Sequence, residues 1–554
     1  MGSRGPVLPR RRPPPGVREG LGAVLQPPRR AARQPAAAAA LPLRGHLPGA
    51  PAARRERRRG AGEVNAAASA SDLERDARDL RRGTRINLLG YGLRLLYPLL
   101  TGVAVVLYGR REFGLFVTAQ AALLVTLRIC LAGLDKAVLW WVPRQPAGEE
   151  RRGLAGALLW VLCAGTVAAA AVAGFGAPWL AAWSGDAAAA APLRWMALGL
   201  VPMASMELLV HACLGRRRLE AQVFVKEGLG AVALPAAATL LWLAGVREGG
   251  LAWSFVIANV AALAGAGWLF RRSFPAVAPA GVGWSVPRPL VRYGLPMGLM
   301  ELLNSALLRL DVLVLAALTD PATVGVWGVV VQVGNAVRSV RSGFDPLVLA
   351  IVSQIHVRPD PARLRAVFSR ATVLVLATQA PIYAFLVAFV PWLLPLLGEG
   401  YVAAATPVLV LCAFWVLHGA FGLHGLIVLS HGRSGLAAAN VGATLVMEAL
   451  LLLLLVPPLG LVGAALAVGL AFTAQTALWT WQSRRLIGAW PYDPALRPVL
   501  LVLAAAAAAM LAAWVVAWPA GEAVARVGAF GAFLLTGAVG WLRLHEGSLR
   551  HAVL

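Results

Sequence analysis

Apolar segments, each long enough to cross a lipid bilayer as an α-helix, follow one another from Ile86 almost to the end of the chain. About 20 residues cross the hydrocarbon core. Backbone groups in hydrocarbon must bond within their own segment, which favours helices. The composition agrees, because 59% of the residues are hydrophobic and only 14% are charged, whereas a soluble domain carries about 25% charged residues. The sequence therefore predicts an all-α polytopic membrane protein.

The apolar runs divide into about fourteen expected transmembrane helices, each near or above the length that a bilayer requires. No connection between them is large enough to hold a folded soluble domain. The expected spans are 86–108, 113–134, 154–177, 191–213, 228–246, 250–270, 290–318, 322–350, 369–397, 402–428, 435–456, 460–481, 497–518 and 524–543.

Residues 1–85 differ sharply from the rest in composition. They hold 19 Arg against 7 acidic residues, which is +12 of the formal net charge of +25. Their Arg/Pro/Ala-rich sequence buries too little apolar surface to offset the entropy of ordering, so we expect a disordered basic cytoplasmic tail. Val64 could derive from a GTG start codon, in which case residues 1–63 would not be translated.

The basic residues between the spans set the orientation. With the tail inside, the connections on the cytoplasmic side carry 20 Lys and Arg, among them Lys136 and Lys226, against 5 on the other side. This is the bias of the positive-inside rule, and it predicts that both termini are cytoplasmic. Arg is much commoner than Lys and the chain is rich in Ala and Gly. This bias favours a GC-rich bacterial genome and therefore the bacterial inner membrane.

Several functional classes find no support in the residues. The basic loops fit anionic lipid headgroups and lack the aromatic-interleaved pattern of a nucleic-acid-binding protein. His211 lies two residues from Cys213, but one His and one Cys do not make a metal site, and we expect His211 at the membrane interface. No nucleotide-binding loop or catalytic set is recognisable. We therefore expect no cofactor, no metal, no nucleic-acid partner and no enzyme activity.

Two short motifs suggest an internal repeat. Glu112-Phe113-Gly114-Leu115-Phe116 and Thr323-Val324-Gly325-Val326-Trp327 stand at matching places, each before the second helix of a six-helix set. Parallel repeats related by an axis along the membrane normal are a common plan in transporters.

The sequence as a whole resembles the polysaccharide-export branch of the multidrug/oligosaccharidyl-lipid/polysaccharide (MOP) exporter superfamily, the Wzx-type flippases. The resemblance covers about residues 86–485, and its clearest segment runs from YGLPMGLMELLNSALLRLDVLVLAAL through TDPATVGVWGVVVQVGN. It implies two six-helix lobes, 86–271 and 290–482, around a central cavity, with two additional helices in 496–543. It also implies a flippase that carries undecaprenyl-pyrophosphate-linked oligosaccharide to the periplasmic leaflet by alternating access. Polymerases or glycosyltransferases of the same pathway are possible partners.

Polar residues inside apolar spans are functional candidates, because each costs several kcal/mol when exposed to lipid. Arginine binds phosphate oxygens through a planar fork and stays charged when desolvated, so a cationic cavity would suit a pyrophosphate headgroup. For ion coupling we expect Asp311, Glu301 or Asp345. The alternative is that Glu301–Arg309 and Arg341–Asp345 are structural ion pairs. The expected substrate-binding residues are Arg94, Arg128, Arg309, Arg338, Arg341, Asn304 and Asn335.

Three other functions stay open. A lipid II flippase shares every feature described so far. A multidrug or cation antiporter of the same superfamily is less favoured, because cationic drugs need an acidic or aromatic cavity, and Arg outnumbers carboxylate in the candidate spans. A membrane-embedded glycan polymerase or ligase would ordinarily have a large periplasmic loop, and the connections expected on that side are short.

Overall fold

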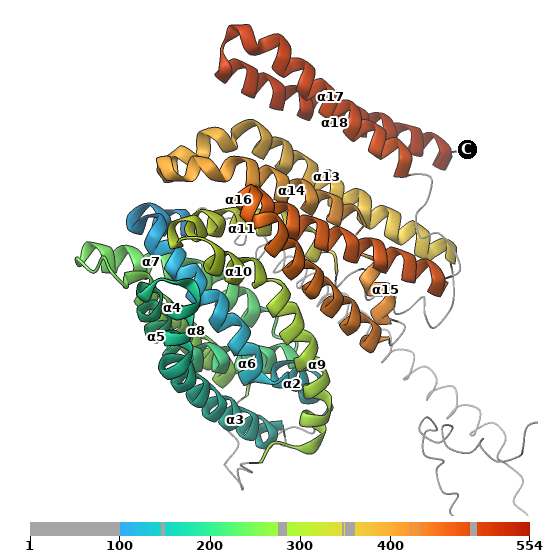
Figure 1. Cartoon of the computed structure of the whole chain (residues 1–554). Helices are drawn as coiled ribbons and strands as arrows, with labels where there is room; N and C mark the ends of the chain where they lie inside the picture. The colour runs from blue at the N-terminus through green and yellow to red at the C-terminus, as the bar shows by residue number, and fades with distance from the viewer. Residues whose placement is uncertain are drawn as a thin grey trace, which may run out of the picture. The chain divides into compact units, whose positions relative to one another are not determined.

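The computed structural model describes residues 100–145, 150–274, 285–345, 348, 361–421, 423–430, 433–487 and 496–553, all within one compact unit of the chain. The regular structure of these residues is helical, and they contain no strand (Figure 1). The predicted all-α class is therefore confirmed. The predicted tail 1–85 and Arg94 lie outside the described residues.

The first described helices belong to residues 100–274, which we call the N-terminal half. Two stretches of wider π-helical winding, Val172–Gly176 and Gln222–Leu229, precede α4 and α7 respectively. The helices are Leu100–Leu131, α2 (Leu134–Trp141), α3 (Glu150–Ala171), α4 (Ala177–Ser184), α5 (Ala190–Ala197), α6 (Leu200–Gly215), α7 (Gly230–Leu243) and α8 (Gly250–Ser273).

Residues 285–487 form what we call the C-terminal half, and two further helices follow it as a hairpin (Figure 1). The helices of the C-terminal half are α9 (Arg288–Leu307), α10 (Leu310–Leu318), α11 (Pro321–Ser342), α13 (Pro361–Leu393), α14 (Ala405–Phe421), α15 (His424–Ser430) and α16 (Ser434–Ile487). The hairpin consists of α17 (Leu496–Ala517) and α18 (Glu522–Val553).

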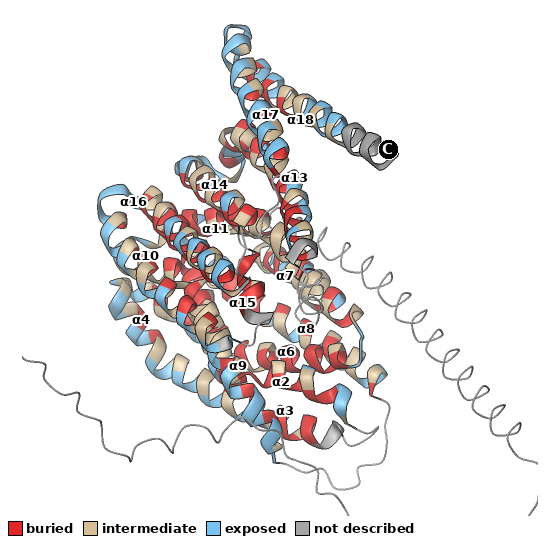
Figure 2. Ribbon diagram, turned by 90° about the vertical axis from the view of Figure 1, so that its right-hand side faces the viewer, coloured by how far each residue is buried: buried red, intermediate tan, exposed pale blue. Residues whose placement is uncertain are grey.

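Nine helices in the described residues are long and apolar enough to cross a membrane, or ten if the bent pair Ala187–Ala197 and Leu200–Gly215 forms one span. Many of their outward side chains are apolar and exposed, as the broad exposed faces of α17 and α18 show (Figure 2). Phe175 is 81% exposed and Val516 is 78% exposed. Such extensive apolar surface is rare on a soluble monomer and suits lipid. The multi-pass membrane character is confirmed, and the count of fourteen stays a prediction.

Two of the continuous helical stretches are interrupted at a glycine. Gly109 has φ 77° inside Leu100–Leu131, and Gly460 has φ 55° and ψ −132° inside α16. An α-helix cannot continue through such a residue, and glycine adopts these angles without steric cost. Both interruptions fall next to a predicted connection, namely those between spans 86–108 and 113–134 and between spans 435–456 and 460–481.

The predicted span 290–318 differs from the structure, because it contains a break. α9 ends at Leu307, and α10 begins at Leu310 after Arg309, which has φ −130° and ψ −6°. No proline or glycine marks this position, so the sequence pattern showed one helix. A discontinuous helix in a transporter frees backbone groups and commonly lies beside a binding site.

The start of α11 is fixed by its own first residues. The Asp320 carboxylate accepts hydrogen bonds from the Ala322 and Thr323 amides at 2.8 and 3.1 Å and from the Thr323 hydroxyl at 2.6 Å. The Thr323 hydroxyl and these amides hold the pKa of Asp320 below its usual value. Pro321 occupies the first helical position, where its missing N–H is not needed.

The two repeated motifs pack directly against each other. A Cβ atom on Gly114 would overlap the Pro321 carbonyl and lie 2.8 Å from the Gly325 nitrogen, and one on Gly325 would overlap the Arg110 carbonyl. The relation is reciprocal, because each glycine meets the carbonyl four residues before the other. The rings of Phe113 and Trp327 are fully buried beside this contact. The repeat seen in the sequence therefore places two glycines where only glycine allows the backbones to approach.

The α17–α18 hairpin is joined to α13 through Arg526, which falls within the predicted span 524–543. The Arg526 side chain is 7% exposed. Its Nη1 donates to the Ala388 carbonyl of α13 at 2.6 Å, and its Nε and Nη2 donate to Glu522 at 2.8 and 2.6 Å. Trp514 covers the guanidinium at 4.9 Å. A charge at this depth is tolerated because its donors are satisfied.

Replacing Gly325 by leucine is expected to force the two motifs apart. A backbone contact cannot move aside as a flexible side chain can, so we expect the free energy of unfolding to fall by about 1–3 kcal/mol. The loss would be measured as a lower unfolding temperature of the detergent-solubilised protein, followed by tryptophan fluorescence. Gly267→Leu on α8 is the control, because nothing lies within 4 Å of its Cβ position. Equal losses in both variants would contradict the close-contact role.

Candidate substrate and coupling site

The predicted site residues, Arg94 apart, lie in the described part of the chain and fall into two groups. Arg128 and Glu301 belong to a charged network beside α2 and α6. The others lie on α9, α10, α11 and the residues that follow α11. Asn304 and Asn335 are half-buried on α9 and α11, and Asn335 stands one turn before Arg338.

The first group forms around Asp135, near the start of α2. Asp135 is 1% exposed. Its Oδ2 lies 3.6 Å from Arg128 Nη1 and 3.9 Å from Lys136 Nζ. Arg128, for which the sequence showed no carboxylate within one helical turn, therefore has an acidic neighbour across the turn that ends the Leu100–Leu131 helix. Lys136 was expected in a loop and instead lies on a helix with a buried face (Figure 2).

The network continues into α6. His211 Nε2 lies 3.9 Å from Asp135, and His211 Nδ1 lies 2.8 Å from the Glu207 carbonyl oxygen. Glu207 is 6% exposed and lies 2.6 Å from Lys226 Nζ. His211 is thus buried rather than interfacial, and Lys226 is an ion-pair partner in the wide turn before α7. We call Arg128, Asp135, Lys136, Glu207, His211, Lys226 and Glu301 the N-terminal charge cluster.

One ion pair of this cluster joins the two halves of the chain. Lys136 of α2 lies 3.4 Å from Glu301 of α9. Beside it a Cβ on Gly298 would lie 2.5 Å from the Ala132 carbonyl carbon, and Trp140 stacks on Tyr293 with centroids 4.7 Å apart. The halves are therefore tightly packed here and, near the middle of the Leu100–Leu131 helix, at Gly114 and Gly325.

The second group surrounds the break between α9 and α10. Asp311, which is 6% exposed, accepts a hydrogen bond from Trp327 Nε1 at 3.0 Å. Arg341 Nη1 lies 3.4 Å from Asp345 Oδ1, so the predicted i, i+4 ion pair is present. We call Arg309, Asp311, Arg338, Arg341, Asp345 and Glu448 the C-terminal charge cluster.

Arg338 differs from the other arginines of this cluster. Its guanidinium lies 5.3 Å from the centre of the Trp415 ring, and among the described residues it forms no salt bridge. It interacts electrostatically with Arg309 and Arg341 as well as with Asp311 and Asp345. Three arginines therefore share one region with Asp311 and Asp345, where Asp345 pairs with Arg341 and Asp311 accepts the hydrogen bond of Trp327.

Glu448 on α16 was missed by the sequence reasoning. It is 1% exposed, neither of its carboxylate oxygens has a hydrogen-bond partner among the described residues, and it interacts electrostatically with Asp311. The signal was present, because Glu448 lies in the middle of the predicted span 435–456, as Glu207 does in 191–213. The rule that singled out Asp311 applies equally to both. This rule could not identify Asp135, Lys136 and Lys226, because the sequence analysis assigned these residues to connections between spans.

The described residues contain no group of three or more His, Cys, Asp and Glu side chains poised to hold a metal ion. What the two clusters offer is charge. Each holds three acidic and three basic residues besides His211, but the groups of the first are paired by salt bridges, whereas Arg338 of the second has no salt bridge among the described residues. The second arrangement can bind an anion, and the buried Asp311 and Glu448 can exchange a proton or a cation.

Exchanging the charges of Lys136 and Glu301 tests their pairing. Lys136→Glu alone should abolish transport or membrane yield, because it places four carboxylates in one buried network. Lys136→Glu combined with Glu301→Lys should recover most of the loss. Yield is measured by immunoblot and fluorescence-detected size exclusion. A double variant as poor as the single one would show that the two side chains do not depend on each other.

Known proteins resemble this chain in sequence and in fold. The family model described as polysaccharide biosynthesis protein matches residues 107–406. Comparison with curated protein sequences gives no match. Solved structures share the fold, and two of them illustrate the similarity. An inward-facing multidrug resistance MATE family transporter of the MOP superfamily is 14% identical, with TM-score 0.59 over 73% of this chain and 98% of its own. The lipid II flippase MurJ, inward closed, is 10% identical, with TM-score 0.64 over 85% of this chain and 99% of its own. The chain thus belongs to the polysaccharide biosynthesis protein family and has the fold of the MOP-superfamily transporters.

Proposed function

We propose that this protein flips an undecaprenyl-pyrophosphate-linked oligosaccharide from the cytoplasmic to the periplasmic leaflet of a bacterial inner membrane, for surface polysaccharide biosynthesis. The family supports a role in polysaccharide biosynthesis, and the fold supports a transporter. A lipid-linked sugar is the substrate class that joins these two features.

The observation that carries the proposal is Arg338, a basic side chain of the C-terminal charge cluster without a salt bridge in the described part of the chain. Arg338 is half-buried beside Trp415 and has no salt bridge among the described residues, and Arg309 and Arg341 lie within electrostatic range of it. An unpaired charge within apolar helices is costly and functional by default. A pyrophosphate would complete the coordination of Arg338, because guanidinium groups bind phosphate oxygens bidentately.

The halves of the chain would act as the two lobes, 86–271 and 290–482, with the headgroup and glycan between them and the lipid tail outside. Asn304 and Asn335 would bind sugar hydroxyls beside Arg338. Arg128 would reach the substrate only after release from Asp135, and Arg94 is expected to add a further positive charge.

Ion coupling would use the buried carboxylates. The Glu448 carboxylate has no hydrogen-bond donor among the described residues. Its charged form is unfavourable there unless a proton or a cation neutralises it. Asp311 is the neighbour with which Glu448 would exchange it. Glu301 and Asp345 would respond to the same movement through their pairs with Lys136 and Arg341. The basic loops support cytoplasmic termini, and glycosyltransferases or a polymerase of the same pathway would supply and consume the substrate.

Complementation tests the substrate and Arg338 together. The wild-type chain should restore surface glycan in a bacterium that lacks its own oligosaccharide flippase. Arg338→Ala should reduce it roughly tenfold or more, since a hydrogen bond to a charged group contributes about 1.5–3 kcal/mol. Arg485→Ala is the matched control, because Arg485 also lies over a tryptophan ring, at 4.9 Å, away from the cluster. Immunoblots of membranes verify equal levels.

The rival functions predict other results. Rescue of a strain depleted of its lipid II flippase, without rescue of glycan export, would assign the protein to lipid II. Drug efflux without either rescue would favour the multidrug exporter. Equal activity of Arg338→Ala and Arg485→Ala in a rescued strain would exclude Arg338 from substrate binding.

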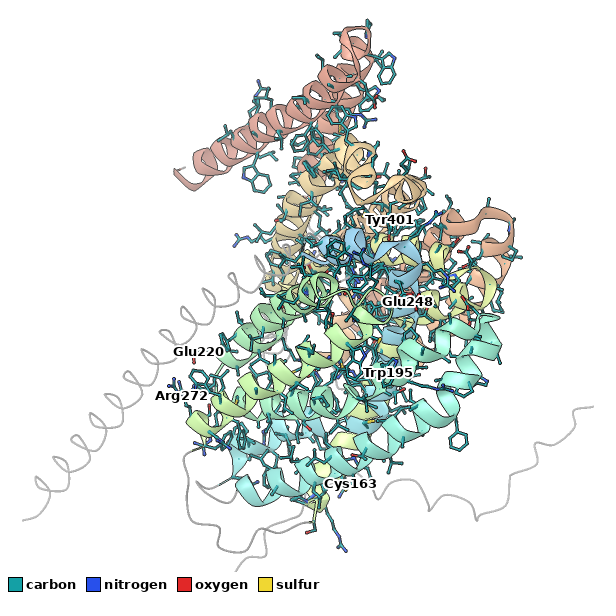
Figure 3. All side chains as sticks on the ribbon, turned by 90° about the vertical axis from the view of Figure 1, so that its left-hand side faces the viewer. Cys163, Trp195, Glu220, Glu248, Arg272 and Tyr401 are labelled. Atoms are coloured by element: carbon teal, nitrogen blue, oxygen red, sulfur yellow. The ribbon has the colours of Figure 1, made fainter. Side chains whose placement is uncertain are left out.

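Glu448→Gln separates coupling from binding. The amide keeps the shape of the side chain and cannot take up or release a proton, so we expect substrate binding to persist while flipping loses its dependence on the ion gradient. The measurement is glycan export after the proton or sodium gradient is collapsed. Glu248→Gln, at an exposed position in the turn before α8 (Figure 3), should retain the normal dependence. A gradient-dependent Glu448→Gln would contradict the coupling role.

A further inference from the structure

A cavity of about 270 Å³ lies where the turn after α6 meets the end of α8, apart from both charge clusters. Figure 3 shows two of its lining residues, Glu220 and Arg272, beside each other at the edge of the molecule. The cavity is lined by Arg218, Glu220, Ala221, Leu269, Arg272 and Ser273. We propose that it binds the phosphate headgroup of an anionic phospholipid of the surrounding leaflet.

The side of the cavity that carries Arg218 is formed where α6 ends abruptly. Arg217 has φ 60°, a left-handed conformation that is rare without glycine. The Arg217 amide donates to the Leu214 carbonyl at 2.8 Å and the Arg218 amide to the Cys213 carbonyl at 3.1 Å, so the helix end is closed by the chain itself. Three consecutive arginines are thereby exposed on one turn.

The charge of the region favours an anion. Arg218 and Arg272 line the cavity, Arg216, Arg217 and Arg271 are their neighbours in the sequence, and all five are exposed. The single carboxylate in the wall, Glu220, lies 3.6 Å from Arg218. It opposes an anion, but the pair with Arg218 is solvent-exposed and such pairs are weak. A phosphate between Arg218 and Arg272 would gain charge-assisted contacts that outweigh it.

Two aromatic rings indicate that the phosphate belongs to a lipid. Arg272 lies 3.9 Å from the centre of the Trp268 ring, and Trp268 is 6.4 Å from Phe224 by ring centroids. Trp268 is 48% exposed and Phe224 is 49% exposed. They stand on helical segments apolar enough to cross the membrane, Gly250–Ser273 and Gln222–Leu243, near the ends that carry the arginines. Aromatic rings below a basic rim match the headgroup level of a bilayer, and a free phosphate would make no use of them.

Native mass spectrometry of the intact protein, released from detergent with added lipid, tests the site. Phosphatidylglycerol should bind more tightly than phosphatidylcholine, and Arg218→Gln with Arg272→Gln should weaken phosphatidylglycerol binding about tenfold or more. Arg247→Gln is the matched control: Arg247 lies 4.4 Å from the Trp242 ring at the other end of α8, and its loss should leave the affinity unchanged. Trp268→Ala should also weaken phosphatidylglycerol binding.

Soluble glycerol phosphate distinguishes the two sources of phosphate. It should fail to compete with phosphatidylglycerol at equal concentration. Full competition, or insensitivity to Trp268→Ala, would overturn the lipid assignment in favour of a free-anion site. An equal loss of phosphatidylglycerol affinity in the double variant and in Arg247→Gln would show that surface charge alone attracts the lipid. That result would overturn the assignment of the binding site to this cavity.

Discussion

Charged side chains buried among apolar helices are the constraint on which this structure depends. Each would cost several kcal/mol in hydrocarbon if it stood alone, and many of them lie against a partner on the same helix or on another one. In the N-terminal charge cluster, Asp135 and Glu207 are nearly inaccessible to solvent and lie against basic groups from three different segments. Removing one partner leaves a buried charge uncompensated, which costs far more than the pair contributes. These contacts therefore fix the helices relative to one another more strictly than apolar packing does.

The two clusters differ in how their buried charges are compensated, and this difference suggests different roles. Acids and bases balance in the first, and its Lys136–Glu301 pair joins the two halves of the chain. Arg338 and Glu448 of the second have no ion-pair partner among the described residues. Paired groups hold a conformation, whereas under the proposed function the two unpaired groups would bind what they lack, an anion at Arg338 and a proton or cation at Glu448. Glycine contacts at Gly114–Gly325 and Gly133–Gly298 bring the two halves of the chain close together at two places.

The sequence identified some of the charged residues of the two clusters and missed others, and one physical reason accounts for both outcomes. Residues within apolar runs, such as Asp311 and Arg338, were recognisable because a polar side chain there contradicts its surroundings. Glu448 and Glu207 obey that rule and could have been found by it. Asp135, Lys136 and Lys226 could not, since beside a turn a charged residue looks like an ordinary loop residue until the tertiary structure shows what covers it. The break at Leu308–Arg309 was equally hidden, because neither a proline nor a glycine marks it.

The sequence by itself determined that the chain is helical and crosses a membrane repeatedly, since the length and period of apolar runs reflect the thickness of the bilayer. It also identified two matching motifs as related. Only the tertiary structure decided that Gly114 and Gly325 meet each other, that Arg128 lies beside Asp135, and that Glu448 approaches Asp311. These are contacts between segments far apart in the chain. Local periodicity shows which face of a helix is polar, and helix packing alone decides what that face meets.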